Sequence, residues 1–307
     1  MHVWTHHRAT FPLPANHKFP LPKYALLRER VVGEGLAAPA EVHETDPVAW
    51  TQLRAVQDPA LVERIRTGAL SVREQRGLGL PWSPELVERG RRSAAGTVAA
   101  AFHAVEHRVA MNLGGGTHHA GRDFARGYCL FNDVAVATQA LRAAHVAARV
   151  LVVDCDVHQG DGTAQVLGGR ADPDAFALSL HGARNYPFKR IPSDLDLDLE
   201  TGTGDEAYLA ALDAALDRAL GSFGTPDFAF YLAGADPWKG DRLGRLALTK
   251  PGLRMRDDLV LDRLGEVGVP VAVVLAGGYA PDVGDTVDIN TATAAAVAAR
   301  YVATAAP

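Results

Sequence analysis

The segment Leu151–Gly162 constrains the fold of this chain most, because it begins as an apolar run and then places three carboxylates and an imidazole ahead of its final glycine. A buried strand normally excludes unpaired Asp and His, since removing such groups from water costs several kcal/mol. Asp156 and His158 stand two residues apart, so an extended chain directs both side chains to one face. Asp154 shares that face and can support them from beneath. A divalent metal at the carboxyl end of this strand would compensate these groups.

The rest of the chain alternates short apolar runs with helical patterns, which indicates an α/β fold with a parallel sheet covered on both faces. No repeat or long linker interrupts this order, so we predict a single domain over residues 1–307. The other predicted strands are Val3–Thr5, Glu41–Glu44, Val109–Leu113, Phe176–Leu180, Phe228–Leu232 and Val271–Ala276. The predicted helices are Tyr24–Val32, Pro47–Val56, Pro59–Thr67, Pro84–Glu106, Leu130–Ala148, Asp205–Leu220 and Leu253–Leu264.

Composition narrows the class of protein. A net charge of −5 over 307 residues gives no reason to expect a nucleic-acid partner. The two cysteines, Cys129 and Cys155, provide neither a disulfide framework nor a cysteine-based zinc motif, which suits a reducing cytoplasm. We find no signal sequence and no apolar run of about 18 residues that would span a membrane. We therefore expect a cytoplasmic protein, with its oligomeric state left open.

Polar side chains and glycines follow four of the predicted strands directly. Ligands of a parallel sheet bind beyond the carboxyl ends of its strands, so these side chains are expected to share one pocket. Glycines beside them allow the backbone to approach a ligand closely. The polar residues are His118 and His119 after the strand at 109–113, Asp154, Asp156, His158 and Asp161 after the strand at 151–153, Asp236 after the strand at 228–232, and Tyr279 after the strand at 271–275.

Asp156, His158 and Asp236 form a set of one imidazole and two carboxylates. Such a set leaves positions open for water or substrate and suits a catalytic Zn²⁺ or Fe²⁺ site. An aspartate after a strand often caps a helix instead, and for Asp236 alone both interpretations stay open.

His118 and His119 are adjacent in a glycine-rich loop, from which both rings can line a pocket. Paired with a carboxylate through one ring nitrogen, each can exchange a proton through the other. Asp154 and Asp161 are the candidate carboxylates. Tyr279 can donate a hydrogen bond to a developing oxyanion. Taken singly, two loop histidines are ordinary surface residues and a tyrosine beside glycines is often a packing residue.

Two further patterns resemble metal sites and are rejected. His103 and His107 match the His-x-x-Glu-His pattern of metalloprotease helices. They precede a strand rather than follow one, so they fall at the wrong end of the sheet and are interpreted as a solvated helix face. Asp194–Asp198 has the alternating aspartates of a calcium loop, but Leu199 stands where the turn requires glycine.

Five segments together resemble the histone deacetylase superfamily, in the family's order and at compatible spacing over roughly residues 1–279. The short chain and the entry at Phe11–Tyr24 are most similar to the compact bacterial and class IV-like members. The segments are Asn112-Leu-Gly-Gly-Gly-Thr-His118-His119-Ala, Gly127-Tyr-Cys-Leu-Phe131-Asn132-Asp133, Val153-Asp154-Cys-Asp156-Val-His158-Gln-Gly-Asp161-Gly-Thr163, Gly234-Ala-Asp236-Pro and Gly277-Gly-Tyr279.

The resemblance implies the arginase/deacetylase fold, a three-layer α/β/α arrangement around a central, mainly parallel eight-stranded sheet. It implies Zn²⁺ held by the set of three named above, with Fe²⁺ as an alternative. It implies His119 as general base and then acid, oriented by Asp161, and His118 as its electrostatic partner, paired with Asp154. Tyr279 would polarise the amide carbonyl.

The resemblance also implies two sets of binding residues. It predicts a substrate tunnel for a lysine stem, with either Tyr186 or Phe188 as its second aromatic wall. The region Arg76–Pro81 lacks the aspartate with which class I members hold the substrate backbone. The implied substrate-binding residues are Gly127, Tyr128, Tyr186, Phe188 and Gly277. The implied K⁺ site uses Asp154, Asp156, the backbone near His158, Ser179 and Leu180.

The leading hypothesis is therefore a zinc-dependent amidohydrolase that removes acetyl or other acyl groups from lysine side chains or related amines. Acetylpolyamines and other small amides stay open as substrates. A ureohydrolase with two manganese ions shares the fold but requires an Asp-x-Asp pair where this chain has only Asp236. A metal-holding protein without catalysis is the remaining alternative.

Overall fold

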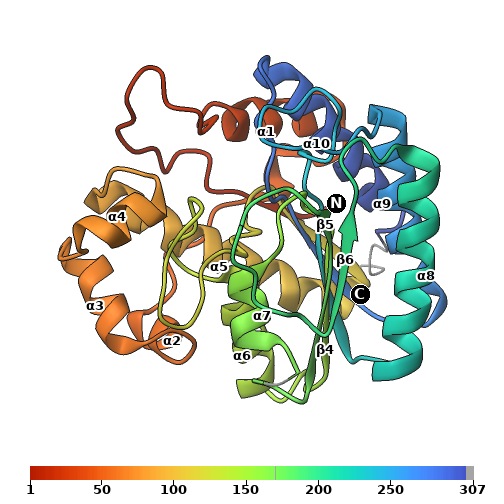
Figure 1. The fold of residues 1–307 in the computed structure, drawn as a ribbon, viewed down its shortest axis with the longest axis horizontal. Coiled ribbons are helices and arrows are strands. Elements are labelled where there is room, and N and C mark those ends of the chain that lie inside the picture. Colours follow the sequence, from red (N-terminus) through yellow and green to blue (C-terminus); the bar gives the residue numbers. More distant parts are fainter. Residues whose placement is uncertain (170, 302–307) are drawn as a thin grey trace.

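A computed structural model describes residues 1–169 and 171–301. Eight strands form one sheet in the order β2-β1-β3-β8-β7-β4-β5-β6, and every neighbouring pair is parallel (Figure 1). The fold class is confirmed, and the single-domain interpretation of 1–307 stays a proposal. The strands are β1 (Val3–Trp4), β2 (Val42–His43), β3 (Val109–Asn112), β4 (Val150–Asp154), β5 (Ala175–Gly182), β6 (Leu195–Leu199), β7 (Phe228–Leu232) and β8 (Val271–Val274).

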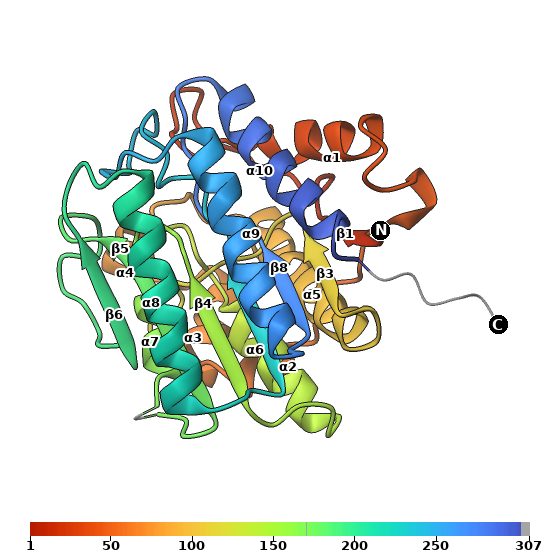
Figure 2. The ribbon, with the colours of Figure 1, turned by 90° about the vertical axis from the view of Figure 1, so that its right-hand side faces the viewer.

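Helices cover both faces of the sheet, with α2 to α7 on one side and α1, α8, α9 and α10 on the other (Figures 1 and 2). Among the described residues, none of the helices is both long and apolar enough to cross a bilayer. The helices are α1 (Lys23–Gly33), α2 (Trp50–Arg54), α3 (Pro59–Thr67), α4 (Val72–Leu78), α5 (Pro84–His107), α6 (Asp133–Ala143), α7 (Asp161–Leu167), α8 (Asp205–Phe223), α9 (Lys250–Glu266) and α10 (Val283–Ala298), with a 3₁₀ turn η1 (Pro39–Glu41).

Burial on both faces of the sheet explains why the central strand β4 is apolar as far as Asp154. Val150 and Val152 pack into the core on the α5–α6 side, while Leu151 and Val153 pack into the core on the α8–α10 side. Because side chains of a strand alternate between faces, a strand covered on both sides needs an unbroken apolar run. That run ends at Asp154, the first side chain at the carboxyl edge.

Four elements of the structure were not predicted from the sequence, and a fifth is shorter than predicted. The eighth strand, β6, was not predicted, because the strands were sought as continuous apolar runs. In β6, Leu195, Leu197 and Leu199 alternate with aspartates, as in a strand with one buried face. The rejected calcium-loop pattern therefore lies in this edge strand. Three helices, α4, α7 and α10, were also not predicted. The helix predicted over 130–148 is shorter, because Asn132 caps its start by accepting from the Ala135 N–H at 2.9 Å.

Candidate active site

The carboxyl ends of β3, β8, β7 and β4 lie side by side, because these four strands are consecutive in the sheet. They are the four strands after which the sequence places polar residues and glycines. The topology therefore brings together residues that lie far apart in the chain, as the strand order of a parallel sheet allows.

Asp156, His158 and Asp236 meet at this edge, all of them buried. One ligand atom from each lies within 4.8 Å of the others, and among the described residues this is the only such set of three. His158 Nδ1 lies 2.9 Å from Asp156 Oδ1 and 3.3 Å from Asp236 Oδ2. Asp236 does not cap a helix; its Oδ1 accepts from the Val157 N–H at 3.0 Å.

The chemistry of this set fits a divalent metal ion. Asp236 Oδ2 is buried and accepts no hydrogen bond in the structure. Burial and the neighbouring charge of Asp156 raise the pKa of Asp236 to about 7. Burial would lower the pKa of His158, but its close contacts with the carboxylates of Asp156 and Asp236 outweigh it and raise the pKa to about 10. Two buried carboxylates this close favour a cation between them.

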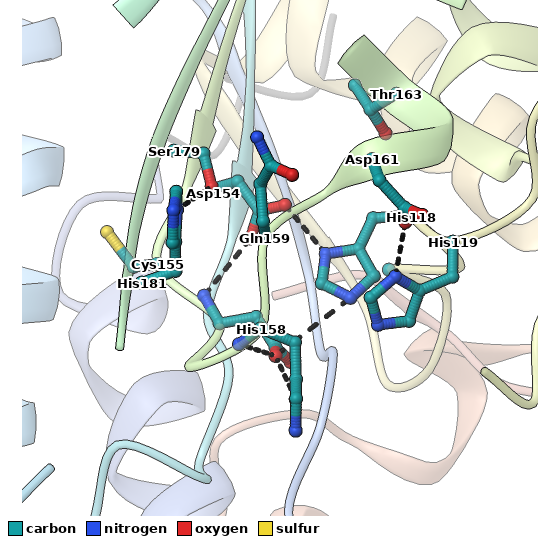
Figure 3. Close-up of polar contacts among 12 residues, drawn as sticks. His118, His119, Asp154, Cys155, His158, Gln159, Asp161, Thr163, Ser179 and His181 are labelled. Carbon is teal, nitrogen blue, oxygen red and sulfur yellow. Dashed lines mark hydrogen bonds and ion pairs between the residues drawn. The ribbon is translucent and has the colours of Figure 1, made fainter. Parts of the chain in front are cut away.

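His118 and His119 each have a carboxylate partner of their own (Figure 3). His118 Nδ1 lies 2.7 Å from Asp154 Oδ2, and His119 Nδ1 lies 2.6 Å from Asp161 Oδ1. All four side chains are buried. Because each Nδ1 faces an aspartate, each Nε2 is directed away from it, and His118 Nε2 lies 3.9 Å from Asp156 Oδ1.

The two histidines differ in protonation. Burial would lower the pKa of His118, but the charges of Asp154 and Asp156 outweigh it and raise the pKa to about 9. Burial lowers the pKa of His119 well below its usual 6.5, and the positive charges of His118 and His158 add to that effect. At neutral pH His118 is thus cationic and His119 neutral, and a neutral imidazole can accept a proton.

The glycine loop after β3 takes its shape from Asp133, at the start of α6. Its carboxylate accepts from the backbone N–H groups of Gly116 at 3.0 Å and Thr117 at 2.8 Å. It also accepts from the hydroxyl groups of Thr117 and Thr97, each at 2.6 Å. His118 and His119 follow this loop directly, so the buried Asp133 carboxylate fixes the position of the backbone that leads into them. The motif contains Asp133, but its spacing alone gave no role for it.

Two arginines support the site and were not predicted from the sequence. Arg256 of α9 is fully buried and donates to the carbonyl oxygens of Gly234 at 2.6 Å and Cys155 at 3.3 Å, joining the loops after β7 and β4. Arg126 pairs with Asp161 Oδ2, on the carboxylate oxygen that His119 leaves free. Both come from outside the strand ends, so no local pattern marks them.

A cavity of about 500 Å³ is lined by the two histidines and by two of the three candidate metal ligands, Asp156 and His158. Aromatic residues line it: the Tyr186 ring meets the His119 ring edge-on at 5.0 Å, and the Tyr128 ring lies 5.9 Å from that of Tyr279. Phe188 also lines the cavity but is 88% exposed, so it stands at the rim. Of the two aromatics that the sequence left open, Tyr186 lies against His119.

Tyr279 lines the same cavity from the loop after β8. Its backbone N–H donates to Asp241 Oδ2 at 2.6 Å, which holds the loop in place. Burial and the charge of Asp156 raise the pKa of its hydroxyl well above 10, so it keeps its proton for donation.

Two glycines of the predicted substrate site are required by close contacts. At Gly277, a Cβ atom would overlap the carboxylates of Asp236 and Asp156, while its N–H donates to Asp156 Oδ2 at 2.6 Å. At Gly127, which has φ of +56°, a Cβ atom would overlap the His119 ring.

The residues predicted to hold a monovalent cation lie on β4 and β5 or directly after β4. Ser179 is the register partner of Asp154 across the two strands, and Leu180 follows it. Ser179 Oγ also lies 2.9 Å from His181 Nδ1.

Comparison with known proteins adds independent evidence about the family to which this chain is similar. A model of the histone deacetylase domain matches residues 17–295. An uncharacterized protein of Picosynechococcus sp. is 41% identical over 276 residues, which cover 90% of this chain and 91% of that protein. Histone deacetylase 2 of Arabidopsis thaliana is 33% identical over 192 residues, 62% of this chain and 49% of that protein. The chain thus spans about half the length of the plant relative.

A solved structure shows the same fold. The acetylpolyamine aminohydrolase of Burkholderia pseudomallei matches 95% of this chain and 97% of its own with a TM-score of 0.75. At 23% sequence identity, this similarity speaks for the fold alone.

Proposed function

This chain belongs to the histone deacetylase family of hydrolases, which act on acetyl amide bonds, and we propose that it is a zinc-dependent deacetylase of acetylated amines. Asp156, His158 and Asp236 would hold the metal. When bound there, a divalent ion acts as a Lewis acid toward the amide carbonyl and the attacking water. Fe²⁺ is the alternative ion, because the same donor set accepts it.

The chain's own residues divide the proton transfers and the charge stabilisation. Neutral His119, oriented by Asp161, takes the proton of the attacking water and later gives it to the leaving amine. Cationic His118, held by Asp154, stabilises negative charge beside it. The Tyr279 hydroxyl donates to the oxygen on which negative charge develops.

One observation carries this proposal: two histidines, each paired with a buried aspartate, line a single cavity together with Asp156 and His158 of the three-residue metal set. A protein that only stores metal needs the three ligands but has no use for two differently protonated histidines beside them. A ureohydrolase needs a second metal, and the described residues provide only one set of three ligands.

The aromatic lining of the cavity suits a substrate with a narrow amine stem. We propose that Gly127, Tyr128 and Tyr186 contact the stem, and that Phe188 contacts the substrate at the rim. Residues 76–80 also line the cavity without an acidic side chain, so backbone recognition of a protein substrate lacks its usual acceptor. Acetyl-lysine and acetylated polyamines both fit these features. We also propose that K⁺ binds at Asp154 and Ser179 with the neighbouring residues named above.

The test is a panel of acetylated amines given to metal-loaded and chelator-stripped protein. Acetyl-lysine peptides, acetylputrescine and acetylspermidine cover both substrate classes. We expect acetate release from at least one of them, only in the metal-loaded sample, and restoration when Zn²⁺ or Fe²⁺ is returned. Absence of acetate release over the whole panel from protein with a full metal content would overturn the proposal.

A further inference from the structure

Beyond the metal cluster, the cavity extends to two buried cations, Lys23 at the start of α1 and Arg89 of α5. They are 3% and 5% exposed. Among residues 1–169 and 171–301, no carboxylate lies within 4.0 Å of the charged nitrogens of either side chain. Buried cations in proteins are normally paired, because an unpaired one is costly to remove from water.

The partners that these cations do have are carbonyl oxygens and aromatic rings rather than anions, and they leave hydrogen-bonding capacity unused. Lys23 Nζ donates to the Ala276 carbonyl oxygen at 3.3 Å. Arg89 Nη1 donates to the Ala9 carbonyl oxygen at 2.7 Å, but Arg89 Nη2 is buried without a partner. The Tyr24 ring lies 4.1 Å from the Arg89 guanidinium and 5.2 Å from Lys23 Nζ.

The pKa of Tyr24, whose ring contacts both cations, reflects the positive potential that they create. Burial alone would raise the pKa of Tyr24, yet the charges of Lys23 and Arg89 outweigh it and lower the pKa. The nearby His6 also lines the cavity; burial and the charge of Arg89 lower its pKa, so it adds no charge of its own. This part of the cavity therefore has two positive charges and no negative one.

The position of Lys23 relative to Tyr279 indicates which part of a substrate reaches the two cations. Lys23 Nζ lies 5.9 Å from the Tyr279 ring, whose hydroxyl serves the amide carbonyl in the proposed function. If the amine stem passes Tyr128 and Tyr186, the acyl group on the other side of the carbonyl is directed inward. The acyl end then meets Lys23 and Arg89.

We infer that Lys23 and Arg89 form a carboxylate-binding subsite for acyl groups that end in a carboxylate, such as succinyl and glutaryl. This inference rests on the proposed function and names its substrate class. Water hydrolyses the amide: its oxygen bonds to the acyl carbon, the C–N bond breaks, the amine receives a proton, and the acyl group leaves as a dicarboxylate. No oxidant or further reactant is needed.

The test compares two acyl groups of the same shape on one lysine peptide: succinyl and its neutral analogue, 4-amino-4-oxobutanoyl. With metal-loaded wild-type protein, we expect kcat/KM for succinyl to exceed that for the analogue about tenfold or more, the size of one charge-assisted hydrogen bond. Lys23→Met should bring this ratio close to one, whereas Lys23→Arg should retain it. Lys18→Met, which removes an exposed lysine outside the cavity, is the matched control and should leave the ratio unchanged.

The outcomes separate this inference from the proposed function. If acetyl-lysine is hydrolysed and the succinyl ratio is one or below in wild-type protein, the inference is wrong and the proposed function stands. The inference is also wrong if free acetate inhibits in a Lys23-dependent way while the ratio stays at one, because the cations then serve the released acid. If metal-loaded protein hydrolyses no amide, acetyl included, both are overturned together.

Discussion

Two pairs of histidines lie at opposite ends of the sheet, His118 with His119 and His103 with His107, and their surroundings differ. His118 and His119 lie at the carboxyl ends of the strands, and each has a buried aspartate within 2.7 Å of its Nδ1. His103 and His107 end α5, just before β3 begins. Their rings stack on each other at 3.9 Å, and His103 Nε2 lies 3.0 Å from the Tyr301 hydroxyl.

This difference shows that the spacing of histidines says little about function without their partners. His103 and His107 match a known metal-binding pattern, yet His103 lies among aromatic and imidazole rings, including His2 and His43. His118 and His119 match no metal pattern, yet each is held by a carboxylate. The carboxylate fixes which ring nitrogen faces the cavity, and that makes an imidazole useful for proton transfer.

Removal of a metal ligand should have the largest effect. We expect Asp236→Ala to abolish both metal binding and acetate release, because it removes one of three ligands and leaves the others too few. The matched change in the other pair's motif, Glu106→Ala, should leave metal content and turnover as in wild type. Metal analysis of purified protein, followed by the acetate assay on the same samples, measures both. Tight metal binding by Asp236→Ala would contradict the assigned ligand set.

A comparison of two tyrosines comes next in size. Tyr279→Phe should lower kcat by about 10²- to 10³-fold, the loss typical of one oxyanion donor. Tyr301→Phe removes the hydroxyl beside His103 and should leave kcat unchanged. Steady-state kinetics with the best acetylated amine measures both. An equal loss in the two variants would mean that the Tyr279 hydroxyl has no specific role.

The carboxylate partners should matter less than the groups they orient. Asp161→Asn keeps a hydrogen-bond acceptor near His119 but removes the negative charge, and we expect kcat/KM to fall about 10- to 100-fold. Metal content should stay unchanged, because Asp161 is not a ligand. A variant with wild-type kcat/KM would show that the carboxylate does not orient the base.

The His103 surroundings should affect acid stability and little else. Burial and the positive charges of His107, His2 and His43 lower the pKa of His103 to about 4, below its ordinary value of 6.5. The unfolded chain therefore binds a proton at higher pH than the folded one, so the free energy of unfolding falls as the pH drops from about 6.5 to about 4. We expect His103→Gln to flatten this fall in urea denaturation measured across that range. A steeper fall in the variant would contradict the assignment.

The placement of the candidate metal ligands and of Tyr279 could be predicted from the sequence because each of these residues closely follows a strand. Asp156, His158, Asp236 and Tyr279 stand within five residues of the end of an apolar run, and a parallel sheet brings such ends together. The unusual chemistry of charged residues beside glycines then marked the positions. A helix-capping role remained open for Asp236 until the structure showed the hydrogen bond to Val157.

What the sequence did not reveal comes from elements far from the strand ends. Arg256, Lys23 and Arg89 are helical residues that an amphipathic pattern would assign to the surface, and only tertiary packing buries them. The edge strand β6 was hidden for a similar reason, since its alternating aspartates resemble a calcium loop when no neighbouring strand is known. Burial of a charge depends on partners that no local window contains.

The most direct test of the central claim measures metal content and acetate release on the same samples of wild-type, His119→Ala and His103→Ala protein. All three should bind one equivalent of metal. Acetate release should fall about 10²- to 10⁴-fold in His119→Ala alone, the range expected for loss of a general base. Undiminished turnover by metal-loaded His119→Ala, or an equal loss in His103→Ala, would contradict the assignment of the catalytic pair.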